Sequence, residues 1–195
     1  MDIRWFRVIK EGKAPIINDF KVSRIEPWMI YQDESYGTSI LSLFEFSIIN
    51  SVIPVMIEHD VAVDAQIMDR FEERVKKDLT AERPVLTGTY LLAHGASPMS
   101  SNRVRKEDGD LSWWYEGFVD FIGWGFWAVR PTNRILELPW SGWDYPISDT
   151  QFSLECQRRD IPLYATGIWG MHLHTIDKRI GGDKDGTSAQ NSLTD

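Results

Sequence analysis

Ile53-Pro-Val-Met-Ile-Glu58-His59-Asp60-Val-Ala-Val-Asp64 is the stretch from which we predict the fold of the chain. A short apolar run, interrupted only by Pro54, leads directly into Glu58, His59 and Asp60. An apolar run that ends in acidic residues is typical of a buried strand, and we expect this strand to lie in a parallel sheet. Ligands of open α/β sheets bind at the carboxyl ends of the strands, so we expect a site at Glu58 to Asp60.

The acidic residues of this strand end, Glu58 and Asp60, are candidate metal ligands. Side chains two positions apart on a strand project to the same face, so we expect both carboxylates on one face and His59 on the other. Hard oxygen ligands suit Mg²⁺ or Mn²⁺, and such an ion suits a phosphate-bearing substrate. The alternative is that Asp60 is an ordinary turn residue. We interpret Asp64 as a helix cap, because a helical pattern begins directly after it.

The composition indicates one globular domain. The chain has 195 residues, of which 43% are hydrophobic and 26% charged, enough for a full core. A net charge of −8 argues against binding nucleic acid or a membrane through the whole surface, although a local basic patch is compatible with it. The single cysteine, Cys156, excludes an internal disulfide and a cysteine-based zinc site. Without a signal-peptide pattern or an apolar run of membrane-spanning length, we expect a cytoplasmic protein with no membrane partner.

The rest of the chain alternates between strand-like and helix-like patterns. Strands are expected at Arg4 to Ile9, Trp28 to Tyr31, Pro84 to Leu92 and Ile161 to Ala165. Helices are expected from Thr38 or Ser39 through Asn50, after Asp64, and from the capping box at Ser148 to Arg159. A polar segment from His94 to Asp110 is expected to be a loop. This alternation predicts an α/β domain over residues 1–178 with a mostly parallel central sheet, followed by a disordered polar tail over 179–195.

Other polar residues near the ends of the expected helices and strands are candidate catalytic residues or metal ligands. Asp149 would lie in the first turn of its helix, where the helix dipole favours the carboxylate form, and it is a candidate base. His172 and His174 would share one face of an extended segment, and one of them could be a metal ligand; we favour His174 because it ends the strand. Glycines at 123 and 125 interrupt an aromatic segment and would allow close approach of a ligand or another backbone.

The order of these features resembles the GT-A glycosyltransferases of the family 2 type. Glu58-His59-Asp60 lies where that family has its Asp-x-Asp motif, and Ser148-Asp149 is similar to the position of its catalytic base. Phe118 to Arg130 looks like the segment that lines the donor-sugar and acceptor pocket. The Glu-His-Asp spelling and the ending Met171-His172-Leu173-His174 look most like the phage-encoded TET-associated glycosyltransferases, which are thought to glycosylate hydroxymethylated pyrimidines in DNA. The resemblance covers about residues 53 to 175.

This resemblance implies a single GT-A-like (Rossmann-like) domain that transfers a sugar from a nucleotide-diphosphate sugar, with UDP favoured, to a hydroxyl acceptor. It implies an inverting, Mn²⁺- or Mg²⁺-dependent enzyme of the host cytoplasm, with modified phage DNA as a candidate acceptor and Asp149 as base. The implied metal ligands are Asp60, Glu58 and either His174 or His172. The implied donor contacts are Glu58, Asp60, Gly123, Trp124 and Gly125.

The segment before Glu58 departs from the family pattern. It has only 57 residues and lacks the usual Pro-x-Tyr-Asn nucleotide loop, so we expect an abbreviated nucleotide-binding half. Asp33 or Glu34 is a candidate for holding the uracil or the ribose. For a DNA acceptor, the candidate phosphate contacts are Arg103, Arg105 and Lys106, and the candidate stacking surfaces are Trp113, Trp114, Trp124 and Trp127.

Two other functions are compatible with the sequence. A metal-dependent hydrolase would use His172, His174, Asp60 and His59, but strand alternation separates His59 from Asp60. A non-catalytic sugar-binding domain built on the tryptophans would leave the acidic strand end without a role. Binding of a nucleotide diphosphate together with a divalent metal ion separates the glycosyltransferase from both. The sequence leaves the oligomeric state open.

Overall fold

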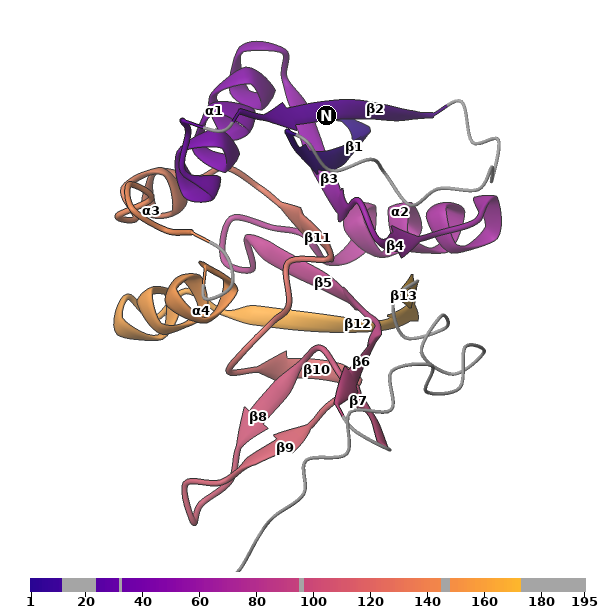
Figure 1. The fold of residues 1–195 in the computed structure, drawn as a ribbon, viewed down its shortest axis with the longest axis vertical. Helices are drawn as coiled ribbons and strands as arrows, with labels where there is room; N and C mark the ends of the chain where they lie inside the picture. Colours follow the sequence, from indigo (N-terminus) through magenta and orange to yellow (C-terminus); the bar gives the residue numbers. More distant parts are fainter. Residues whose placement is uncertain (12–23, 32, 95–96, 145–147, 173–195) are drawn as a thin grey trace, which may run out of the picture.

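The computed structural model describes residues 1–11, 24–31, 33–94, 97–144 and 148–172. Its central sheet has seven strands in the order β10 (Glu116–Val119), β12 (Leu163–Trp169), β5 (Val85–Thr89), β11 (Phe126–Val129), β3 (Val52–Glu58), β1 (Asp2–Lys10) and β2 (Ile25–Ile30) (Figure 1). β2, β1 and β3 pair in parallel, and so do β5 and β12. β11 is antiparallel to both β3 and β5, and β10 is antiparallel to β12. Five strands therefore run in one direction and two in the other, which confirms the mostly parallel α/β sheet.

Helices cover both faces of this sheet. One face packs against α1 (Tyr36–Ile49), α3 (Asn133–Leu136) and α4 (Ser148–Arg158), and the other packs against α2 (Ala65–Asp78). Strand alternation divides β3 between the two sides: Met56 lies in the core under α1 and α4, whereas Val55 and Ile57 lie in the core under α2. The unbroken apolar run of β3 is therefore explained by burial on both faces.

Side chains that cap the helix N-termini determine where α1 and α2 begin. The Asp64 carboxylate accepts a hydrogen bond from the Ile67 backbone amide over 2.8 Å, which confirms the predicted cap of α2. The cap predicted for α1 at Thr38 or Ser39 is wrong. Ser35 is the cap, and its hydroxyl accepts from the Thr38 amide over 3.1 Å.

The segment expected to be a loop at His94 to Asp110 is instead partly strand. β6 (Leu91–His94) pairs with β7 (Ser97–Ser100), and β8 (Arg103–Arg105) pairs with β9 (Leu111–Trp113). The turn of the second hairpin contains Gly109 at φ +90°, a conformation that suits glycine. The polar, turn-rich sequence of this segment gives no sign of strands. The short strands form by pairing with each other and contain no long apolar run.

The end of the described chain returns to the acidic strand end. β13 (Met171–His172) pairs antiparallel with β4 (Val61–Ala62), and His172 lies opposite Val61. The predicted tail over 179–195 and His174 lie outside the described residues. No helix in the described part of the chain is both long and apolar enough to span a membrane.

Candidate active site

The acidic pair lies at the carboxyl end of β3, as the apolar run predicted, but its geometry is that of a turn. β3 ends at Glu58, and His59 and Asp60 form a turn before β4 begins at Val61. The expectation that Glu58 and Asp60 share a strand face is wrong, because strand alternation stops at Glu58. His59 is half-buried, and Asp60 is buried.

The side chain of Arg7, in β1, forms hydrogen bonds to the backbone of this turn. Its Nη1 donates to the Glu58 carbonyl oxygen over 2.9 Å and to the Val61 carbonyl oxygen over 3.0 Å. Burial lowers the pKa of Arg7 to about 10, while the nearby Asp60 carboxylate raises it, so the side chain is a cation at neutral pH. A buried guanidinium thus satisfies two turn carbonyls and places positive charge beside Asp60.

The Glu58 carboxyl connects the turn to the start of α1. Tyr36, the first residue of α1, donates from Oη to Glu58 Oε1 over 3.0 Å. Burial, followed by the negative charge of Asp60, raises the pKa of Glu58 to about 7, although the Tyr36 hydrogen bond opposes the shift. Asp149 also raises this pKa, so Asp149 lies within electrostatic range of Glu58.

Asp60 lies beside His172. The Nε2 atom of His172 is 3.3 Å from Asp60 Oδ2. The Tyr90 ring stacks on the imidazole with centroids 5.6 Å apart and an interplanar angle of 14°. The Tyr90 hydroxyl accepts from the Gly125 amide over 3.0 Å, and the Gly125 carbonyl accepts from the Glu58 amide over 3.0 Å. Tyr90 and Gly125 therefore join the histidine to the acidic turn.

Gly123 and Gly125 make room for Tyr90. A Cβ atom added at Gly123 would lie 2.2 Å from the Tyr90 hydroxyl oxygen, and one at Gly125 would lie 2.6 Å from Tyr90 Cζ. The close approach that the sequence predicted is therefore made by a side chain of the protein itself. Contact of this segment with a donor remains a prediction.

The aromatic side chains expected to stack on a base divide into buried and exposed ones. Trp124 and Trp127 are only 2% and 1% exposed and stack on each other with centroids 5.1 Å apart. The prediction that these two offer a stacking surface is wrong, because they are part of the core. Trp113 is half-buried and Trp114 is exposed.

Asp149 lies in the first turn of α4, as the capping-box pattern predicted. Its Oδ1 accepts from the Thr150 amide over 2.7 Å. Burial raises the pKa of Asp149, while the Thr150 hydrogen bond and the positive charge of Arg103 lower it. Asp149 also raises the pKa of the buried Tyr90, so this carboxylate belongs to the same electrostatic environment as the acidic turn.

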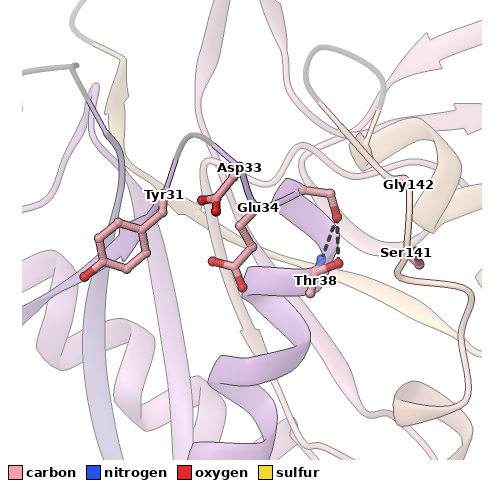
Figure 2. A pocket seen from close by; sticks show the side chains of 7 residues that line it. Tyr31, Asp33, Glu34, Thr38, Ser141 and Gly142 are labelled. Atoms are coloured by element: carbon pink, nitrogen blue, oxygen red, sulfur yellow. Dashed lines mark hydrogen bonds between the residues drawn. The ribbon is translucent and has the colours of Figure 1, made fainter.

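An open pocket of about 790 Å³ lies between the end of β2 and the start of α1 (Figure 2). Its lining includes Tyr31, Asp33, Glu34, Ser35, Thr38, Ser141 and Gly142. Asp33 and Glu34, the predicted nucleotide contacts, both line it. Tyr36 follows the lining residue Ser35 directly in the chain, and its hydroxyl donates to Glu58, so α1 contributes both to the pocket and to the acidic turn.

Three residues of this arrangement were missed by the sequence analysis: Arg7, Tyr36 and Tyr90. Tyr90 had a usable signal, since it directly follows the apolar strand β5 as Glu58 ends β3. Arg7 and Tyr36 had none, because their contacts join positions far apart in the chain. Among the described residues no group of three or more His, Cys, Asp or Glu side chains is arranged to hold a metal ion.

Comparison with known proteins places the fold. No protein-family model matches the chain, and no curated protein matches its sequence. The structure is similar to that of A197 from STIV, with a TM-score of 0.56 and 17% identity, covering 88% of this chain and 85% of that one. It is also similar to CMP:2-keto-3-deoxy-manno-octonic acid synthetase complexed with CTP, with a TM-score of 0.52 and 9% identity, covering 92% of this chain and 97% of that one. At these identities the likeness shows the fold alone, a Rossmann-like α/β fold.

Proposed function

We propose that this chain is a glycosyltransferase that moves a sugar from a nucleotide-diphosphate sugar to a hydroxyl acceptor. The observation that carries the proposal is the acidic turn at the carboxyl end of β3. There Arg7 donates to the carbonyls of Glu58 and Val61 on either side of Asp60, and Glu58 lies within electrostatic range of Asp60 and Asp149. A fold neighbour complexed with CTP supports a nucleotide as the ligand of this sheet edge.

The pocket beside α1 suits the nucleoside part of the donor. The carboxylates of Asp33 and Glu34 can accept hydrogen bonds from ribose hydroxyls, and the exposed Tyr31 offers a ring for the base. The diphosphate would then extend toward Glu58 and Asp60. We favour UDP as the nucleotide because of the sequence resemblance.

The acidic turn suits a divalent ion that is shared with the substrate. Mg²⁺ is commonly bound by one or two carboxylates plus substrate phosphates and water, so a full set of protein ligands is not required. Glu58 and Asp60 would supply the carboxylates, and His172, beside Asp60, would be the candidate third ligand. When bound, Mn²⁺ or Mg²⁺ would neutralise charge on the departing diphosphate.

Asp149 is the proposed base. As the acceptor oxygen bonds to the anomeric carbon of the sugar, the bond from that carbon to the diphosphate oxygen breaks, and Asp149 takes the proton of the acceptor hydroxyl. Burial raises the pKa of Asp149, which strengthens it as a base, while the Thr150 hydrogen bond and the positive charge of Arg103 favour its carboxylate form. A single displacement of this kind inverts the anomeric configuration.

A second candidate is a nucleotidyltransferase, favoured by the structural likeness to the CMP-sugar synthetase over 97% of that chain. In that reaction a sugar oxygen bonds to the α-phosphorus of a nucleoside triphosphate, and pyrophosphate leaves. The two reactions consume different nucleotides, so one assay separates them.

The test offers the full chain nucleotide sugars or nucleoside triphosphates, with Mn²⁺ and three kinds of acceptor. These are free sugars, neutral oligosaccharides, and duplex DNA with or without hydroxymethylated pyrimidines, the acceptor that the sequence resemblance implies. We expect a hexose mass added to an acceptor and release of a nucleoside diphosphate, both lost in Asp149→Asn. Release of pyrophosphate with formation of a nucleotide sugar would instead establish the second candidate. Neither product with any pair of substrates would contradict both.

A further inference from the structure

Two exposed aromatic side chains meet next to the candidate active site. Tyr115 and Trp169 have ring centroids 5.1 Å apart, and they are 52% and 38% exposed. We call this pair the aromatic platform. An exposed aromatic pair of this kind is a typical ligand-binding surface, because its apolar faces are left in water.

A bulge in β12 presents Trp169 on this surface. The register of β12 against β5 shifts between Ala165 and Trp169, and Gly167 within the bulge has φ +72°. β-Bulges re-aim side chains and are frequent next to active sites. Thr89 holds both halves of the platform: its backbone carbonyl accepts from the Gly170 amide over 2.8 Å, and its hydroxyl donates to the Tyr115 carbonyl over 3.3 Å.

The end of β5 connects the aromatic platform to the candidate active site. Thr89 ends β5, and the next residue, Tyr90, stacks on His172 beside Asp60. Trp169 also lies only three residues before His172 in the chain. Gly170, next to Trp169, packs against β4, since a Cβ atom added there would lie 3.1 Å from Val61 Cγ1. A molecule on the platform would therefore lie on the β4 side of the candidate site, away from the pocket proposed for the nucleoside, whose lining includes neither platform ring.

The charge around the platform favours an uncharged acceptor. From Arg103 to Asp120 the chain has three basic and five acidic residues, and the acidic turn adds further negative charge. The guanidinium groups of Arg103 and Arg105 lie over the Phe121 ring, 5.4 and 5.7 Å from its centroid. A polyanion such as DNA needs a local excess of cations, which this segment lacks.

We propose that the aromatic platform binds a neutral carbohydrate as the acceptor, with a sugar ring seated against Trp169 and Tyr115. This rests on the proposed glycosyltransferase function and narrows its acceptor to a glycan. It sets aside modified DNA, because the platform offers aromatic faces without the phosphate contacts that a duplex requires.

The test uses the full chain on an array of neutral and acidic oligosaccharides, alongside a hydroxymethylated duplex. We expect retention of a neutral oligosaccharide, and titration with that compound should show about tenfold weaker binding in Trp169→Ala and in Tyr115→Ala. The matched control is Ile49→Ala, since Ile49 is 82% exposed on α1 and outside the platform, and the affinity of this variant should stay within about twofold of wild type.

Donor binding is measured on the same variants by a thermal shift with UDP and Mn²⁺. If wild type binds UDP but no neutral oligosaccharide, the platform proposal is wrong and the glycosyltransferase proposal stands. It is equally wrong if both platform variants bind the glycan as wild type does, or if they lose duplex binding instead. Loss of a dimer in Trp169→Ala would show that the platform is a subunit interface, which also overturns the proposal. Absence of any UDP shift in wild type would count against the glycosyltransferase itself.

Discussion

Tyr36 donates a hydrogen bond to Glu58 over 3.0 Å and so ties the first residue of α1 to the last residue of β3. The negative charge of Asp60 acts on the same carboxyl. The Tyr36 hydrogen bond fixes the orientation of this carboxyl, whose pKa of about 7 allows it to change charge near neutral pH. Binding of a cation or a diphosphate at the turn is therefore expected to depend on pH in this range.

The first prediction concerns the stability of the free protein. The pKa of Glu58 is raised from 4.5 to about 7 on folding, so the folded state binds the proton more tightly than the unfolded state. Its contribution is therefore most favourable below about pH 4.5 and is lost as the pH rises to about 7. Glu58→Gln, which is always neutral, should raise the free energy of unfolding at pH 8 by up to about 3 kcal/mol and change it little at pH 5.

Urea unfolding of Glu58→Gln and wild type at both pH values measures this difference. The matched control is Glu45→Gln, because Glu45 is an exposed residue of α1, and its effect should be the same at pH 5 and pH 8. An equal effect of Glu58→Gln at the two pH values would mean that the carboxyl is not buried as described.

The second prediction concerns Arg7. Arg7→Leu leaves the carbonyls of Glu58 and Val61 without their donor and removes the cation near Asp60. We expect a loss of roughly 3 kcal/mol in the free energy of unfolding, as for other broken buried ionic contacts. Arg4→Leu, in the same strand, breaks a partly exposed ion pair with Glu26 and removes a cation over the Phe46 ring, and it should cost about 1 kcal/mol, well below the loss in Arg7→Leu. Equal losses in chemical denaturation would contradict the role given to Arg7.

Local sequence signals predicted strand β3 with acidic residues at its end and the helices α1, α2 and α4, but not the turn that His59 and Asp60 form. The apolar run of β3 and the Asp64 cap act over a few residues, so each can be identified from the sequence around it. The cap of α1 was misplaced because Tyr36 and Gly37 do not look like helix residues, yet both are helical here.

Contacts between segments that are far apart in the sequence could not be predicted from such local patterns. Arg7 and the turn carbonyl of Glu58 are 51 positions apart, and nothing near Arg7 in the sequence marks it as buried. The two glycines of the aromatic segment looked like ligand contacts because the sequence could not show that Tyr90 fills the space beside them.

The third prediction tests this packing. Gly125→Ala should destabilise the protein by about 1 to 3 kcal/mol, because the new methyl group would overlap the Tyr90 ring. In Tyr90→Leu, which removes that ring, the same glycine change should cost much less. A double-mutant cycle of the free energies of unfolding measures the coupling, and additive effects would show that Gly125 is needed for another reason.

The central claim is that the acidic turn binds a nucleotide diphosphate together with a divalent ion. The direct measurement is the thermal shift of wild type and Asp60→Ala with UDP and other nucleoside diphosphates, each with and without Mn²⁺. At a hundred times the dissociation constant, ligand binding stabilises the native state by about 2.7 kcal/mol, which raises Tm by about 5 to 10 °C for a chain of this size. We expect a shift of that order for wild type only when nucleotide and Mn²⁺ are both present, and none for a folded Asp60→Ala. A metal-dependent shift of equal size in Asp60→Ala, or no shift in wild type with any nucleotide, would contradict the account.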